Sequence, residues 1–344
     1  MLFSSQEHEH PFNIDVELLY GNRSKTPTVK LVDSNGTFCE CGCGPNHFSS
    51  TMVINDLDRR LAARISLNIK NELNSTLEIR GITPLDFSGE KIIEAYNETF
   101  VSCDLAYGFF HSKQNNISPY TPMINVKPLK LIIPDPHGDH TVEYYDTDYI
   151  QADKATIKYS NSFFNIESNY WLHLTPRWVN YFSVSYGFGL RYFYYADRIN
   201  ANFFKDPNQS DFSSRTKNHL IGGQALLDFH IHPYTWLDWG IRLDGGALVT
   251  HLRLDFELND LDGQDLLARY SKQKINYGFF GDLEVFLMVK FLNRAYAMGS
   301  YGGTLIHGMA QAMPNINLTT KNFGIYSQGN VLYQYWTLGL GWDF

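Results

Sequence analysis

The chain has 344 residues, of which 44% are hydrophobic, yet its mean hydropathy is −0.28, so its apolar residues are dispersed. It contains no run of roughly eighteen apolar residues, which excludes a membrane-spanning helix. The net charge of −8 without a basic stripe excludes a typical nucleic-acid-binding protein, and 15% aromatic residues favour strands over helical bundles.

Apolar and polar residues alternate with period two along much of the chain, the pattern of strands whose two faces meet different surroundings. In the first of these segments Phe12, Val16 and Leu18 share one face, and Asp15 and Glu17 share the other. The last one ends on an aromatic residue, Phe344, on its apolar face. The alternating segments are 12–20, 60–70, 76–82, 99–111, 162–174, 180–196, 221–231, 237–250, 276–291, 295–308 and 331–344.

Short turns alternate with long polar links, which is the pattern of a bacterial outer-membrane barrel. The turns TPRW, HPYT and LNR are short, and the links at roughly 197–215, 256–274 and 311–329 are long. We therefore predict an all-β, closed antiparallel transmembrane β-barrel over residues 12–344 with long extracellular loops, after an N-terminal tail over residues 1–11. The opening residues show no signal peptide, and we assume that one was removed from the exported form.

The number of strands follows from parity, because both termini of such a barrel lie on the periplasmic side and the count must be even. The alternating segments number eleven. We predict twelve strands, with the missing one at residues 123–133. The alternative is ten, with residues 99–111 belonging to a loop.

Several stretches resemble the β-barrel porin-like outer-membrane proteins of planctomycetes and chlamydia-like bacteria. They are IDVELLYGNRSKTP, RLAARISLNIKNELNSTLEI, KNHLIGGQALLDFHI and LYQYWTLGLGWDF. The resemblance covers most of the chain and implies the barrel fold, the outer membrane and a channel or surface role. It also implies that the cysteine cluster takes part in disulfide links of the cell envelope.

Charged residues of both signs occupy the polar face of the predicted strands. In a wide barrel they would line a water-filled pore, and in a narrow one they would pair and fill the interior. We favour a small pore because inward glycines at 187, 189, 240 and 246 leave space, and we also place His230 and His307 inward. The candidate pore-lining residues are Arg60, Arg64, Glu78, Arg80, Glu167, Arg191, Asp228, Arg242, Asp244, Glu284 and Lys290.

Two loop features offer other chemistry. The acidic segment 134–158 could constrict the lumen, or bind Ca²⁺ as a weak candidate site through Asp135, Asp139, Asp146 and Asp148. The cluster Cys39, Cys41 and Cys43 is a candidate for disulfides within or between chains. We predict no cofactor and no enzymatic activity, since no nucleophile elbow or zinc-protease motif is present.

One strand, 295–308, carries small and polar residues on the face that we expect to point outward. These residues are Tyr296, Met298, Ser300, Gly302, Thr304 and Ile306. Such a face permits close backbone approach, so we predict a possible homo-oligomer through this strand. A bulged strand of a monomer is the alternative.

The resulting functional prediction is a porin-like channel for passive diffusion of small polar solutes, embedded in outer-membrane lipid. The alternative is a structural or surface-interaction barrel of the cell envelope, with disulfide crosslinks through the cysteine cluster as one form of it. A secreted soluble β-glycoprotein is a third hypothesis, which the seven Asn-x-Ser/Thr sequons would suit, although we favour their chance occurrence in a chain rich in Asn, Ser and Thr.

Overall fold

The computed structural model describes residues 12–24, 29–35, 47–52, 60–71, 74–94, 124–125, 131–134, 141–144, 151–152, 154–174, 181–205, 208–259, 266–292, 294–312, 315 and 325–344. No helix in these ranges is long and apolar enough to cross a membrane.

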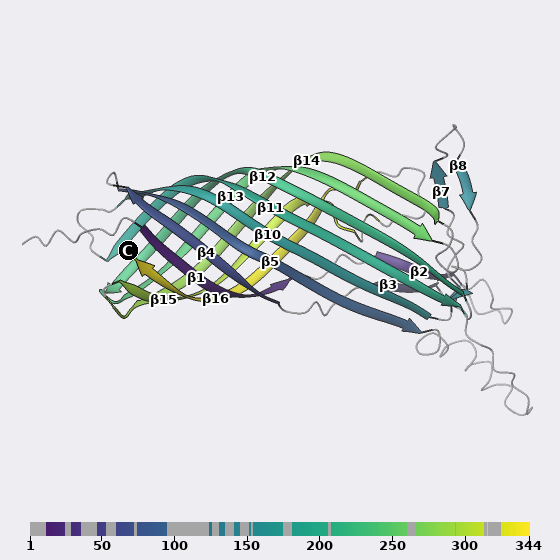
Figure 1. Ribbon diagram of the computed structural model, residues 1–344, viewed down its shortest axis with the longest axis horizontal. Helices are drawn as coiled ribbons and strands as arrows, with labels where there is room; N and C mark the ends of the chain where they lie inside the picture. The colour runs from purple at the N-terminus through teal and green to yellow at the C-terminus, as the bar shows by residue number, and fades with distance from the viewer. Residues whose placement is uncertain are drawn as a thin grey trace, which may run out of the picture.

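Ten antiparallel strands close into a barrel, in the order β1-β16-β15-β14-β13-β12-β11-β10-β5-β4 (Figure 1). The barrel strands are β1 (Phe12–Arg23), β4 (Arg60–Asn71), β5 (Ser75–Glu94), β10 (Lys154–Leu174), β11 (Phe182–Lys205), β12 (Asn208–Tyr234), β13 (Leu237–Asn259), β14 (Leu266–Lys290), β15 (Ala295–Met309) and β16 (Gly329–Asp343). Each strand pairs with its neighbour in the chain, and β1 pairs with β16 to close the ring. The predicted closed antiparallel barrel is therefore confirmed.

The preferred count of twelve strands is wrong, and the alternative of ten is confirmed. β5 pairs directly with β10, which leaves no place in the wall for a strand between them. The described part of 123–133 contributes instead to two small sheets outside the ring. These sheets pair β6 (Ile124–Asn125) with β9 (Gln151–Ala152) and β7 (Leu131–Pro134) with β8 (Thr141–Tyr144). A third pairs β2 (Val29–Asn35) with β3 (His47–Met52). Residues 99–111 and 1–11 lie outside the described residues.

An apolar belt encircles the barrel over one half of its length, because the strands turn their apolar residues outward in that half. On β1 the residues Phe12, Val16 and Leu18 are exposed, while Asn13, Asp15 and Glu17 between them are buried in the interior. Other belt residues are Leu61, Ile65, Ile79, Ile166, Phe188, Leu190, Ile221, Leu243, Val249, Leu283, Val285, Leu287, Leu338 and Leu340. Only a surrounding apolar phase makes so many exposed apolar side chains favourable, so this belt has the surface of a transmembrane barrel.

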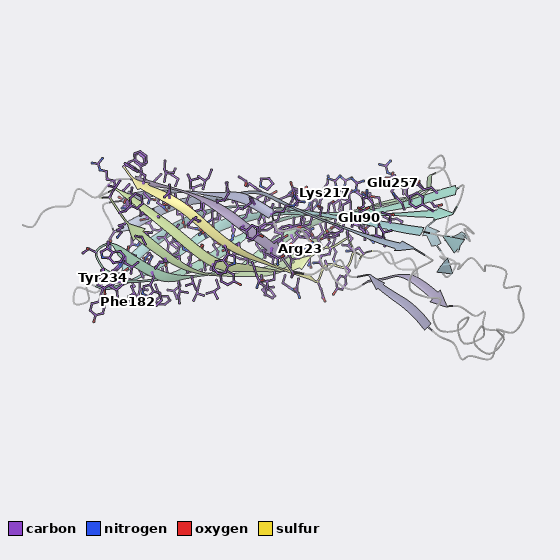
Figure 2. All side chains as sticks on the ribbon, turned by 90° about the horizontal axis from the view of Figure 1, so that it is seen from below. Arg23, Glu90, Phe182, Lys217, Tyr234 and Glu257 are labelled. Carbon is purple, nitrogen blue, oxygen red and sulfur yellow. The ribbon has the colours of Figure 1, made fainter. Side chains whose placement is uncertain are left out.

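Aromatic residues gather where the short turns lie. The rings of Tyr234 and Trp236 stack at 5.5 Å between centroids in the turn between β12 and β13. At the same end Phe344 stacks on Phe12 at 4.9 Å, and its N–H donates a hydrogen bond to the Phe12 carbonyl. In Figure 2 Phe182 and Tyr234 mark this end of the barrel. Amphipathic rings at one rim match the aromatic girdle of a membrane interface.

Six strands, β5 and β10 to β14, continue far beyond the belt. β12 has 27 residues and β14 has 25, whereas about 10 residues suffice to cross a membrane. Consequently the predicted long links at 197–215 and 256–274 are mostly strand, and only residues 206–207 and 260–265 separate the strands there. Residues 154–158 of the acidic segment also belong to the wall, in β10, and do not constrict the lumen.

The prediction of which β15 residues point outward is wrong by one residue. Ser300, Thr304 and Ile306 are buried inside, and Tyr301 and Leu305 are exposed outside. His307 therefore points outward, where its ring stacks on Phe279 at 4.7 Å between centroids. Small residues separated by single bulky ones give this strand no clear polar face, so its pattern did not distinguish its two sides.

Candidate functional site

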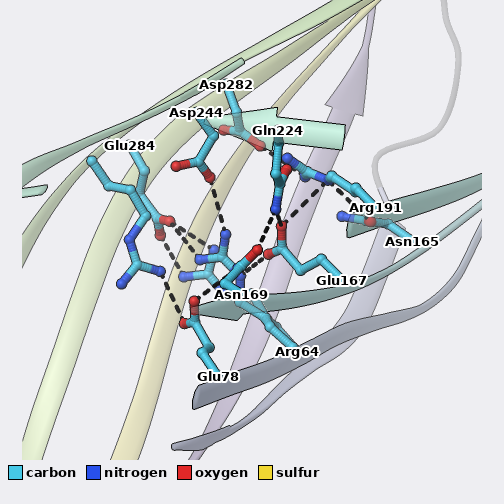
Figure 3. A network of polar contacts seen from close by, with 12 residues as sticks. Arg64, Glu78, Asn165, Glu167, Asn169, Arg191, Gln224, Asp244, Asp282 and Glu284 are labelled. Carbon is cyan, nitrogen blue, oxygen red and sulfur yellow. Dashed lines mark hydrogen bonds and ion pairs between the residues drawn. The ribbon is translucent and has the colours of Figure 1, made fainter. Parts of the chain in front are cut away.

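The membrane half of the lumen is filled by a layer of buried ion pairs, which we call the charge layer (Figure 3). Its first centre is Arg64 on β4, which is 3% exposed. Its Nε and Nη2 atoms donate to the two carboxylate oxygens of Glu17 at 2.8 and 2.6 Å. Its other side reaches Glu284 on β14 across the lumen, with Nη1 3.0 Å from Oε2. One guanidinium thus connects opposite walls of the barrel.

Arg80 on β5 forms the second centre. Its Nε donates to Glu167 on β10, and its Nη2 lies 3.4 Å from Asp244 on β13. Its Nη1 is 3.6 Å from Glu284, which joins this centre to that of Arg64. Gln224 donates to the second oxygen of Glu167 at 2.9 Å. All these side chains are buried, so the contacts form in a low-dielectric interior.

Two further arginines complete the layer. Arg191 Nη2 donates to Asp282 at 3.0 Å, and Arg242 Nη1 donates to Glu78 at 3.2 Å. Arg242 also lies over the ring of Trp171, whose Nε1 donates to Glu78 at 2.8 Å. Tyr335 OH and Thr304 Oγ1 donate to Asp282 at 3.0 and 2.8 Å. The strands turn all these groups into the lumen because each occupies an inward position of the two-residue alternation.

Nine of the eleven candidate residues come together in the charge layer, namely Arg64, Glu78, Arg80, Glu167, Arg191, Asp228, Arg242, Asp244 and Glu284. The other two lie at the ends of the span: Arg60 donates to Ser88, and Lys290 lies 2.8 Å from Asp238 at the short-turn rim. The structure places the set inward as predicted, but pairs it in the manner of the narrow-barrel alternative. The aromatic partners Trp171 and Tyr335 were missed, since only their inward register distinguishes them.

The inward glycines do not open a passage. A Cβ atom on Gly240 would lie 2.6 Å from the Phe286 ring, and one on Gly246 would lie 2.9 Å from the Phe280 ring. At Gly187 and Gly189 it would lie 2.7 and 2.5 Å from backbone carbonyl oxygens of the neighbouring strand. The space that we expected to be pore is therefore occupied by neighbouring side chains and backbone.

Above the charge layer the lumen is filled by apolar and aromatic side chains, which we call the aromatic layer. Phe163 stacks on Tyr333 at 4.2 Å between centroids, and Phe193 meets Phe280 edge-on at 5.2 Å. The pocket beside this layer has room for about one water molecule. The layer consists of Leu19, Ala62, Ile82, Leu85, Phe87, Phe163, Phe193, Tyr195, Leu220, Leu248, Phe280, Ile306, Met309, Val331, Tyr333 and Tyr335.

The link between β15 and β16 packs into the upper barrel. The N–H of Ala310 donates to Asn218 at 2.7 Å, and that of Ala312 donates to Asp197 at 3.0 Å. Burial raises the pKa of Asp197 to about 6, although Arg23 opposes this shift. Arg23 donates to the hydroxyl of Tyr195 at 2.8 Å. This part of the 311–329 link thus adds to the filling of the lumen.

The remaining predicted sites lie outside the described residues. They are the cysteines Cys39, Cys41 and Cys43, and the acidic candidates Asp135, Asp139, Asp146 and Asp148. Among the described residues, no group of three or more histidine, cysteine or acidic side chains is placed to hold a metal ion.

Comparison with known proteins gives no family. No protein-family model matches the chain, and no curated protein matches it. Among solved structures, the chain is similar to the outer membrane protease OmpT from Escherichia coli, with 12% identity, 97% of this chain and 96% of that chain covered, and a TM-score of 0.46. It is also similar to a Pseudomonas aeruginosa FadL homologue, with 8% identity, coverage of 98% and 91%, and a TM-score of 0.29. A third is the Pseudomonas putida toluene transporter TodX, with 4% identity, coverage of 97% and 90%, and a TM-score of 0.27. These similarities are too low to indicate what this chain does.

Proposed function

We propose that this chain is a bacterial outer-membrane barrel whose lumen is closed at membrane level and which serves as a structural or surface-interaction barrel of the cell envelope. The observation that carries the proposal is the pair of stacked layers inside the barrel. The charge layer and the aromatic layer both reach from wall to wall. A pore for passive diffusion needs a continuous aqueous path, and these layers interrupt it.

The extended wall supports the surface role. β5 and β10 to β14 carry the barrel well beyond the belt, so a large surface stands outside the membrane. Its interior residues include Ile157, Ile199, Leu252 and Leu254, all buried. A wall with its own apolar interior keeps a fixed shape, which suits presentation of a binding surface.

Planar-bilayer recording tests the closed lumen. We expect no conductance steps from the wild-type chain, and steps from the double variant Phe163→Ala/Tyr333→Ala, which removes a stacked pair from the aromatic layer. The matched control is Phe188→Ala/Leu338→Ala, which removes two lipid-facing side chains from the belt and leaves the lumen closed. Regular conductance steps from the wild-type chain would refute the proposal.

A transport channel for small polar solutes is the second candidate, and one observation favours it. Several buried polar atoms in the charge layer have no hydrogen-bond partner within the described residues, among them Arg191 Nη1, Asp228 Oδ1 and Asp244 Oδ1. Such atoms are normally satisfied by water, and a hydrated layer would allow its side chains to rearrange and open a path. Uptake of a labelled sugar into vesicles holding the wild-type chain would favour this candidate.

We also propose two routes to assembly: disulfide links through the cysteine cluster, and association of barrels through β15. Disulfide links through the cysteine cluster are tested by migration on reducing and non-reducing gels, where identical migration argues against them. Association through β15 would use its true outward face, with Ala297, Gly299 and Gly303 beside Tyr301. Crosslinking in vesicles that yields only monomers would exclude that contact.

A further inference from the structure

Four cations lie together on the outer surface of the extended wall. Arg198 on β11 is directly opposite Arg215 on β12, and Lys217 on β12 is directly opposite Arg253 on β13. All four point outward, because they alternate with buried residues such as Asp197, Thr216 and Leu254. We call Arg198, Arg215, Lys217 and Arg253 the cationic patch.

The patch lies just above the apolar belt. The highest apolar residue on the outer face of β12 is Ile221, in a row with Val249 and Tyr277, and the next row joins His219 and His251 to the exposed Ile275 on β14. Lys217 is four residues above Ile221, which is about 13 Å along the strand at about 3.3 Å per residue. With a tilt of about 45° this becomes roughly 9 Å of height, a level that long side chains bring into the headgroup region. In Figure 2 Lys217 lies on the half of the barrel away from Tyr234.

The patch has more positive charge than its surroundings neutralise. Arg253 Nε is 3.0 Å from Asp255, and Arg198 Nε donates to the neutral side chain of Asn200. Asp255 also lies directly opposite Arg215 and attracts Lys217 at longer range, but within the described residues neither of these two cations has a carboxylate oxygen within 4 Å. Like charges directly opposite each other destabilise a sheet unless an anion lies between them. Asp255 alone does not balance four cations, so the patch keeps a net positive charge that an external anion would neutralise.

Two other cations on the same wall, Lys158 and Arg269, differ from those of the cationic patch because each forms an ion pair with a carboxylate on a neighbouring strand. Lys158 Nζ is 3.6 Å from Glu90, and Arg269 Nε is 3.7 Å from Glu257. Both pairs lie farther from the belt than the patch does, as the register of β10 to β14 shows. Of these described cations, Arg198, Arg215 and Lys217, which have no carboxylate within 4 Å, thus lie nearer the belt than the paired Lys158 and Arg269.

We propose that the cationic patch binds the phosphate groups of an anionic lipid in the outer leaflet. This inference rests on the membrane placement proposed above. Guanidinium groups form bidentate hydrogen bonds with phosphate oxygens, and the belt directly below the patch accommodates the acyl chains of the same molecule. A lipid satisfies both surfaces at once, whereas a soluble anion satisfies only the patch.

The test measures lipid binding to the full chain in nonionic detergent by native mass spectrometry. Phosphatidic acid is the probe, and phosphatidylcholine is the lipid control. We expect the wild-type chain to retain phosphatidic acid, and the double variant Arg215→Gln/Lys217→Gln to bind it about tenfold more weakly or worse. The matched control Lys158→Gln/Arg269→Gln removes the same charge from the same wall, and we expect it to change the affinity by less than about twofold.

Three results would overturn the proposal: equal losses in the two variants, equal binding of phosphatidylcholine, or displacement of the lipid by inorganic phosphate at the same concentration. The last would indicate a soluble-anion site. Heat-modifiable migration on gels confirms folding of each variant, and the single variants Arg215→Gln and Lys217→Gln replace the double one if it does not fold. Insertion into vesicles is scored separately, so failure of the membrane placement is distinguished from failure of the patch.

Discussion

Replacing Arg64 by Met tests whether the charge layer holds the barrel together. The substitution keeps much of the side-chain volume but leaves Glu17 and Glu284 buried without the guanidinium, and both carboxylates are under 5% exposed. Glu284 keeps Ser300 and a 3.6 Å contact with Arg80, whereas Glu17 loses both of its bonds to Arg64. Removing one partner of a buried ion pair typically costs about 3–5 kcal/mol, so we expect a loss of stability of that size.

Equilibrium unfolding in urea with lipid vesicles, followed by tryptophan fluorescence, measures this loss. Adding Glu17→Gln to Arg64→Met removes the stranded charge, so the double variant should recover roughly 1–3 kcal/mol of it. The surface control is Lys158→Met, whose partner Glu90 is exposed, and it should cost about 0.5 kcal/mol or less. An Arg64→Met variant within about 0.5 kcal/mol of the wild type would refute a structural role for the layer.

Two other predictions concern the short-turn end of the barrel. Burial raises the pKa of Asp238, but hydrogen bonds from Lys290 and His232 outweigh it and leave the pKa below its ordinary value. A depressed carboxyl pKa stabilises the fold above the unfolded-state pKa, near 4, and the effect is lost as the pH falls through the folded-state pKa. The Asp238→Asn variant should thus have a lower urea midpoint than the wild type at pH 7, and the two midpoints should converge toward pH 3; a constant difference would contradict this. Deleting Phe344 removes its stack on Phe12 and should lower the heat-modifiable folded fraction in outer membranes several-fold, whereas an unchanged fraction would exclude an assembly role.

The sequence by itself determined the architecture of the membrane half. A lipid outside and a polar lumen inside impose a two-residue alternation, so residues such as Leu18, Glu17 and Arg64 can be assigned to faces without a structure. The same alternation located all ten barrel strands. The alternation did not exclude residues 99–111 and 123–133 as barrel strands. Alternation shows only that a segment can form a strand, and pairing shows whether the ring has a place for that strand.

Only the tertiary structure decided whether the lumen is open. Inward arginines and carboxylates look alike in a pore and in a filled barrel, and the difference is the distance across the lumen that lets Arg64 reach Glu284. Above the membrane the apolar residues of the alternation face inward and the polar residues face outward, because water replaces lipid outside the wall. Leu252 and Leu254 there turn inward, while Lys217 and Arg253 turn outward. The period of the sequence pattern is unchanged across that boundary, and only the packing of the folded strands shows which face is buried.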